Sequence, residues 1–146
     1  TPQVSSIDLA TYLSDFIATH KRKEDIDYQL NVPSTAETIQ IDPQHLHEVL
    51  EQLLNKAENA INGTAKGVIA INLSTTPERT SLSITDNGHP LTNDQTIDLF
   101  DPTFSTTNSQ TGLGLPICKR IIEFYSGDLQ YAQKDDGNCF VIQLPR

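Results

Sequence analysis

Two glycine-containing turns, 25 residues apart, constrain the fold of this chain more than any other feature. The segment Thr111–Pro116 reads Thr-Gly-Leu-Gly-Leu-Pro and precedes an apolar run with helical spacing. The segment Asp86-Asn87-Gly88 ends an alternating run that is typical of a strand. Glycine lets a backbone turn sharply and approach another group closely. Both turns therefore indicate places where the backbone comes close to another group, such as a ligand, and where a side chain would block this approach.

Hydrophobic spacing predicts three long helices, at 9–21, 43–61 and 115–125. Asp8 and Asp42 stand where helix N-caps are expected, and Pro43 and Pro116 fall in first turns. Strands are predicted at 26–32, 38–41, 68–74, 80–85, 128–133 and 139–144. Consecutive strands are mostly close enough in sequence to pair antiparallel. We therefore expect an α/β sandwich, in which a mixed, mostly antiparallel sheet carries three main helices on one face.

Length and charge limit the possible classes of protein. The 146 residues favour a single domain, 1–146, and the formal charge of −9 argues against nucleic acid or an anionic membrane as the main partner. No apolar run is long enough to predict a membrane span. The chain starts at Thr1 and holds no Met, so we expect an excised domain or a processed product. Cys118 and Cys139 lack metal-ligand spacing, and we expect buried thiols in a reducing compartment.

The connection between the two turns is long and polar. Residues 89–110 are rich in Thr, Asn, Asp and Ser, with a short helix predicted near 93–100. Such a long connection in a compact domain usually has a function. We expect a mobile lid at about 89–111.

Polar residues at helical spacing accompany the turns. Within 43–61, one side of the predicted helix would carry Glu48, Gln52, Asn55, Lys56 and Asn59. Asp86 would accept a hydrogen bond from a base amino group, and the helix start at Gly112 and Gly114 would turn backbone N–H groups toward phosphates. Taken singly, these features also fit a solvated helix face, an ordinary turn and a helix entry. Taken together, they indicate a nucleotide site.

Four segments in order resemble the ATP-binding catalytic domain of sensor histidine kinases, in the wider group that includes DNA gyrase, heat-shock chaperone ATPases and mismatch-repair ATPases. They look like the N box (48–57), the first glycine box (86–88), the F box (99–107) and the second glycine box (111–115). The resemblance implies the Bergerat ATP-binding fold. It also implies ATP contacts from Gln52, Lys56, Asn59, Asp86, Gly88, Thr106, Gly112, Leu113, Gly114 and Leu115.

The N box departs from the family pattern, which usually carries two Asn four residues apart. Gln52 and Lys56 occupy those positions here. The second Asn of the family normally ligates Mg²⁺, and a protonated Lys cannot ligate a cation. Either Asn59 or Asn55 supplies the missing amide oxygen, or the ammonium of Lys56 takes part of the metal's electrostatic role. We therefore expect ATP as the ligand with impaired or altered use of Mg²⁺.

The resemblance implies the catalytic domain of a two-component sensor histidine kinase. Such a domain presents ATP for phosphoryl transfer to a His on a dimerisation domain, absent from this chain, with a response regulator downstream. The alternative is a regulatory domain that binds nucleotide but is impaired in transfer, which Lys56 and Pro90 would favour. A water-activating ATPase is disfavoured because Gln52 has no carboxylate to accept a proton. A serine-kinase anti-sigma factor of related fold is disfavoured by the F box. We expect a cytoplasmic domain that is monomeric in isolation.

Overall fold

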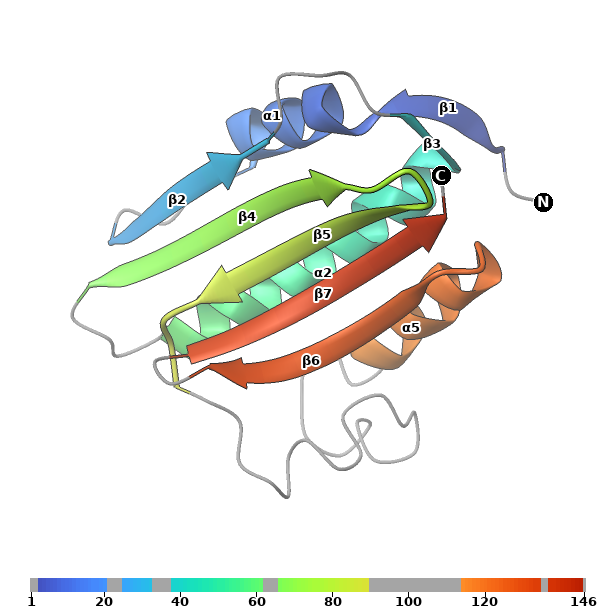
Figure 1. The fold of residues 1–146 in the computed structure, drawn as a ribbon. Helices are drawn as coiled ribbons and strands as arrows, with labels where there is room; N and C mark the ends of the chain where they lie inside the picture. The colour runs from blue at the N-terminus through green and yellow to red at the C-terminus, as the bar shows by residue number, and fades with distance from the viewer. Residues whose placement is uncertain are drawn as a thin grey trace.

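The computed structural model describes residues 3–20, 25–32, 38–61, 66–89, 114–134 and 137–145. Within these ranges the chain forms a strand layer backed by helices (Figure 1). The helices are α1 (Leu9–Thr19), α2 (Pro43–Ile61) and α5 (Gly114–Phe124). The strands are β1 (Ser5–Asp8), β2 (Ile26–Asn31), β3 (Thr38–Ile41), β4 (Gly67–Thr75), β5 (Arg79–Asp86), β6 (Asp128–Lys134) and β7 (Gly137–Pro145). The predicted lid at 89–111, with its short helix near 93–100, lies outside the described residues except for His89.

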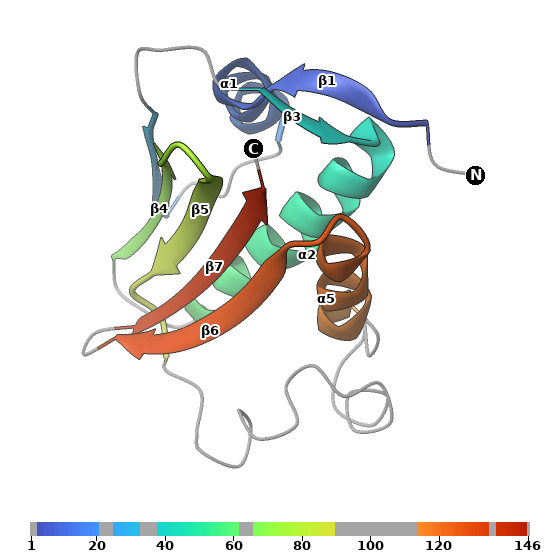
Figure 2. The ribbon, with the colours of Figure 1, turned by 45° about the vertical axis from the view of Figure 1, so that its right-hand side comes forward.

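The main sheet has the order β2-β4-β5-β7-β6. Strands β2 and β4 pair parallel, and the other neighbouring pairs are antiparallel. Figure 2 shows the helices on one side of this sheet. This is the mixed, mostly antiparallel sheet with three helices on one face that the hydrophobic pattern predicts, and the α/β sandwich is confirmed.

The prediction that consecutive strands pair is wrong for β2 and β3. Strand β3 instead pairs antiparallel with β1, a strand that was not predicted, in a separate two-stranded sheet. Ile7 of β1 lies opposite Ile39 of β3, and both side chains are buried in the core. The pairing is decided by this burial, because a strand face gains stability where its apolar side chains leave water.

Both N-caps are as predicted. The carboxylate of Asp8 accepts a hydrogen bond from the backbone N–H of Thr11 at 3.3 Å. Asp42 accepts from the N–H of Gln44 at 2.9 Å and also from the N–H of Gln3 at 2.7 Å. The side-chain oxygens thus satisfy backbone donors that the first helical turn leaves free.

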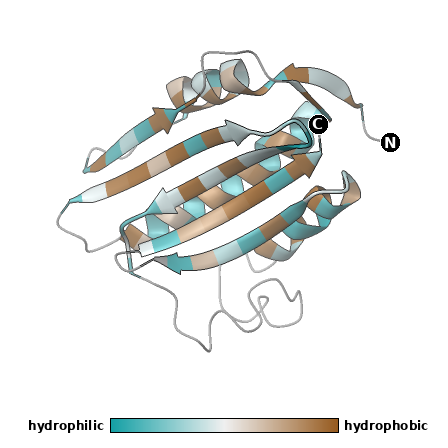
Figure 3. Ribbon diagram, viewed as in Figure 1, coloured by the Kyte–Doolittle hydropathy of each residue, from teal (hydrophilic) through white to brown (hydrophobic). Residues whose placement is uncertain are grey.

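The core lies between α2 and the sheet. Helix α2 buries an apolar stripe, and β4 and β5 mostly alternate buried and half-buried residues. The central strands carry many apolar residues, drawn in brown in Figure 3. Cys118 and Cys139 are buried, unpaired thiols, as expected. Burial raises the pKa of the Cys118 thiol to about 12, so this thiol stays protonated at neutral pH. Among the described residues, no helix has the length and apolar character needed to cross a membrane.

The end of β5 approaches the backbone of α2 very closely at Gly88. A Cβ added at Gly88 would lie 2.3 Å from the carbonyl oxygen of Ala60. The next residue, His89, donates its N–H to that same oxygen at 2.8 Å. Gly88 therefore allows the turn after β5 to rest directly on the last turn of α2.

We expect Gly88→Ala to lower the free energy of unfolding by about 1–3 kcal/mol, because a backbone atom cannot move aside for the new methyl group. Chemical denaturation measures the change. Ser74→Ala, at an exposed position of β4, serves as the control and should change stability by less than about 0.5 kcal/mol. Equal stability of the Gly88→Ala protein and the wild type would contradict the close approach.

Candidate functional site

The Asp86-Asn87-Gly88 turn is fixed to its surroundings on two sides. Gly88 and His89 rest on the last turn of α2, as described above. The side chain of Asn87 accepts from the N–H of Val68 and donates to the carbonyl oxygen of Lys66, each at 2.8 Å. The turn is thus held between α2 and the start of β4, and Asp86 has a defined place above the helix layer.

The carboxylate of Asp86 is buried, with 3% of the residue exposed. Its Oδ1 accepts two hydrogen bonds, from the N–H of Gly88 at 2.8 Å and from Nδ2 of Asn138 at 3.0 Å. Its Oδ2 is also buried, but it has no hydrogen-bond donor among the described residues. A buried carboxylate oxygen without a donor is costly, so this atom is suited to a ligand that brings a donor.

Burial raises the pKa of Asp86 above its ordinary value, and the hydrogen bonds from Asn138 and Gly88 oppose this shift. A raised carboxyl pKa in the folded state means that ionised Asp86 lowers stability at neutral pH. The site therefore holds a charge that the fold alone does not compensate.

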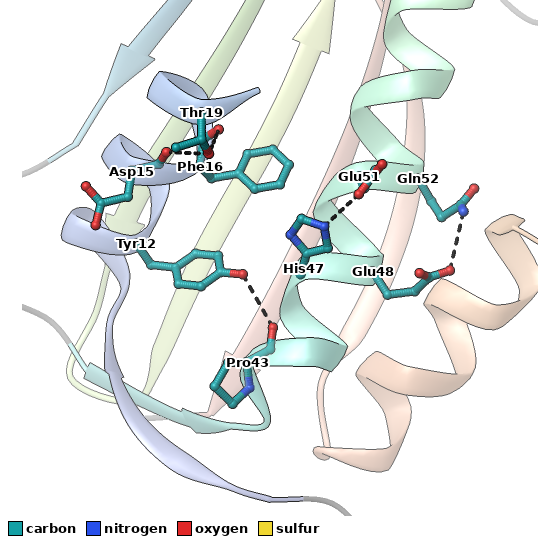
Figure 4. Close-up of polar contacts among 9 residues, drawn as sticks. All are labelled: Tyr12, Asp15, Phe16, Thr19, Pro43, His47, Glu48, Glu51 and Gln52. Carbon is teal, nitrogen blue, oxygen red and sulfur yellow. Dashed lines mark hydrogen bonds and ion pairs between the residues drawn. The ribbon is translucent and has the colours of Figure 1, made fainter. Parts of the chain in front are cut away.

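One side of the polar face of α2 carries Gln52 and Glu48, where Nε2 of Gln52 donates to Oε1 of Glu48 at 3.3 Å (Figure 4). Lys56 follows Gln52 by one helical turn, so it lies next to this side. Lys56 is half-buried, and loss of water contact lowers the pKa of its ammonium group. No anionic partner of Lys56 occurs in the described parts of the chain. Asn59 lies near this side by helical spacing, and its side chain is exposed.

Asn55 lies close to Glu48 by helical spacing, at the edge of this face nearest α1. It lines a groove of about 410 Å³ between α1 and α2, which is also bordered by Phe16, Thr19, His20, His47, Glu51 and Glu58. Glu58 binds Nε2 of His20 at 2.9 Å and accepts a hydrogen bond from the hydroxyl of Tyr28. Asn55 thus borders the groove toward α1 as well as the polar face of α2.

The second glycine box lies at the start of α5. Gly114 is the first residue of this helix, and Leu115 is half-buried in its first turn. Figure 2 shows the start of α5 at the same end of the domain as the carboxyl ends of α2 and β5. Thr106, Gly112 and Leu113 lie outside the described residues, and their predicted contacts stay predictions.

Two residues of this site were missed by sequence reasoning, Asn138 and Tyr131. Asn138 contacts Asp86 directly, and the hydroxyl of Tyr131 contacts Oδ1 of Asn138. The only hint in the sequence was an Asn next to a predicted strand, because Asn is uncommon inside strands. Its partner could not be named without the register of β5, β7 and β6.

Comparison with known proteins gives the same fold and a family. Residues 41–146 match the family described as histidine kinase-, DNA gyrase B-, and HSP90-like ATPases. The catalytic domain of histidine kinase ThkA superposes with a TM-score of 0.84 at 24% identity, covering 98% of this chain and 97% of that one. The mycobacterial sensor histidine kinase MprB superposes with a TM-score of 0.81 at 22% identity, covering 97% and 96% of the two chains. At these identities the likeness establishes the fold.

Curated relatives include two sensor kinases. The sensor histidine kinase ZraS of Escherichia coli K12 is 31% identical over 97% of this chain. The sensor protein kinase PilS of Pseudomonas aeruginosa is 29% identical over 93% of it. The chain spans 31% of the length of ZraS and 27% of that of PilS. The match over 41–146 and these relatives show that the chain belongs to the family of histidine kinase-, DNA gyrase B-, and HSP90-like ATPases and is homologous to the catalytic domains of sensor histidine kinases.

Proposed function

We propose that this domain binds ATP and presents its γ-phosphate to a His on a segment outside this chain. In a sensor kinase that segment is the dimerisation domain, and the response regulator acts downstream. The isolated domain would be a cytoplasmic monomer, since its proposed ligand and partners are cytoplasmic and the dimerising helices are elsewhere. Catalysis of phosphoryl transfer rests mainly on positioning and charge stabilisation, which a preformed site supplies.

The observation that carries the proposal is the free Oδ2 of Asp86. The 6-amino group of adenine is a hydrogen-bond donor of the kind that this buried oxygen lacks. Because Oδ1 already has two donors, the remaining oxygen is left for the base. Gly88 contributes by letting the turn lie flat on α2, which leaves no side chain between the base and the helix.

Lys56 supports a phosphate at the other end of the nucleotide. Its ammonium is half-buried and desolvated, and the described residues offer it no carboxylate. A chain with a net charge of −9 repels an anionic ligand, so a local cation is needed. We place the phosphates between Lys56 and the start of α5, whose first N–H groups favour anions.

The described residues do not fit the family's magnesium site. An ammonium stands where the amide ligand is usual, and the described ranges hold no cluster of His, Cys, Asp or Glu that could hold a metal ion. Mg²⁺ prefers about six oxygen ligands in near-octahedral geometry. We therefore assign part of the metal's electrostatic role to Lys56, with Asn59 or Asn55 as the amide oxygen for any metal ion that binds.

We expect Asp86→Asn to weaken ATP binding by about ten- to a hundredfold, because it removes a hydrogen bond to a charged acceptor. Isothermal titration calorimetry measures the affinity, with exposed Asp15→Asn as the control of equal charge change. Unchanged affinity in the Asp86→Asn protein would contradict the proposed base contact.

The same substitution should not lower stability at neutral pH. Ionised Asp86, whose folded-state pKa is raised, costs folding free energy above that pKa. This cost disappears as the pH falls through the raised pKa toward the unfolded value of about 3.9. At pH 7 the free energy of unfolding of the Asp86→Asn protein, measured in urea, should thus equal or exceed that of the wild type. The difference between the two free energies should shrink on acidification. A large loss of stability at pH 7 would show that the carboxylate has a structural role.

We expect ATP affinity to change by less than about threefold when Mg²⁺ is chelated, because the fixed charge of Lys56 remains. Lys56→Asn restores the family's amide, so its ATP affinity without metal should fall about tenfold and recover with Mg²⁺. Arg79→Asn also removes one positive charge, but at the start of β5, the end away from Asp86. This control should leave ATP affinity unchanged both with and without Mg²⁺. Strong metal dependence of the wild type would refute the role of Lys56.

Phosphoryl transfer is tested by mixing the domain with its cognate His-bearing segment and γ-labelled ATP. We expect label on the His and little steady-state phosphate release by the domain alone, because Gln52 offers no proton-accepting carboxylate. ATP binding without any transfer would instead identify the regulatory alternative. Rapid phosphate release would identify a water-activating ATPase.

A further inference from the structure

Among the described residues, Asp86, His89 and Tyr131 hold the side chain of Asn138 in one orientation. It is buried, with 2% of the residue exposed, and lies opposite Asp86 in the β5–β7 pair. Its Nδ2 donates to Oδ1 of Asp86 and to the carbonyl oxygen of His89, each at 3.0 Å. Both of these partners are acceptors, so the NH₂ end of the amide must face them. The oxygen of the amide therefore points the other way, toward β6.

Tyr131 of β6 meets that oxygen. Its hydroxyl donates to Oδ1 of Asn138. Its ring packs against Phe140, the residue directly across the β6–β7 pair, with ring centroids 5.1 Å apart and an interplanar angle of 55°. Phe140 is buried in the core. The position of the Tyr131 hydroxyl is thus set by packing as well as by the strand register.

These contacts form one hydrogen-bonded chain, from Tyr131 through Asn138 to Asp86. Each donor polarises the next group, so a hydroxyl bound to the amide oxygen makes the NH₂ end a better donor to the carboxylate. The bond from Asn138 and the bond from Gly88 both end on Oδ1 of Asp86. They hold the carboxylate so that Oδ2 remains the free oxygen.

We propose that Tyr131 and Asn138 are positioning residues, which orient Asp86 so that its Oδ2 meets the amino group of the base. The inference rests on the proposed binding of ATP. Their proposed role acts through Asp86 and requires no contact with the base. Removal of the Tyr131 hydroxyl takes a hydrogen bond from Oδ1 of Asn138, so the NH₂ end of this amide becomes a weaker donor and holds the carboxylate of Asp86 less firmly. The consequence is a loss of preference for the amino group rather than a general loss of binding.

The test combines Tyr131→Phe with a nucleotide that lacks the amino group. Purine riboside triphosphate is ATP without its 6-amino group, and calorimetry gives the affinity of each ligand. The wild type should bind ATP about ten- to a hundredfold more tightly than this analogue. Tyr131→Phe should lose at least about threefold in ATP affinity and keep its affinity for the analogue.

Tyr125→Phe is the matched control. The Tyr125 hydroxyl contacts Nδ1 of His45 at 2.6 Å, near the start of α2 and far along that helix from the Asp86 turn. This variant should bind both nucleotides as the wild type does. Urea unfolding of both variants establishes that each is folded under the conditions of the titration.

The outcomes separate the two proposals. An equal loss for both nucleotides in Tyr131→Phe would show a general effect on the fold and would overturn the positioning role. Unchanged ATP affinity in this variant, with a wild type that prefers ATP, would overturn the positioning role and leave the base contact of Asp86 intact. A wild type that binds ATP and the analogue equally would overturn both.

Discussion

The contact between the end of β5 and the last turn of α2 is the constraint on which the site depends. Gly88 has no side chain, so the two backbones meet, and the N–H of His89 donates to the carbonyl oxygen of Ala60. This contact fixes the separation between Asp86 on the sheet and the polar side of α2. In the proposed complex, a nucleotide that spans the two would meet its base partner and its phosphate partner at a set distance, without reorganisation of either element.

The site holds opposite charges at its two ends, and the fold compensates neither fully. Burial disfavours the ionised form of Asp86 and of Lys56 alike, which shifts the pKa of the carboxyl up and that of the ammonium down. Among the described residues, Oδ2 of Asp86 has no donor and Lys56 has no anion. An adenine amino group and a phosphate would meet both needs, so stability given up in the free domain is recovered on binding. Strain of this kind is common at functional sites.

Local features of the sequence were sufficient for the helices and insufficient for the pairing of strands. The period of apolar residues and the caps at Asp8 and Asp42 predicted α1 and α2 within a few residues, because both depend on neighbours in sequence. Strand β1 was missed because Ser5–Asp8 is short and buries a single side chain, that of Ile7. The Tyr131–Asn138–Asp86 chain joins three strands, so no pattern within one segment could reveal it. The N box, by contrast, could be recognised with its departures at Gln52 and Lys56, because its residues are contiguous.

Discrimination between ATP and GTP by the wild-type domain tests the central claim most directly. Guanine carries an oxygen where adenine carries the 6-amino group. With GTP, two hydrogen-bond acceptors would therefore face each other, the guanine oxygen and Oδ2 of Asp86. Calorimetry should show that ATP binds at least about tenfold more tightly than GTP. The Asp86→Asn domain should lose this preference. Equal affinities, or a preference for GTP, would contradict the assignment of Oδ2 of Asp86 as the acceptor for the base.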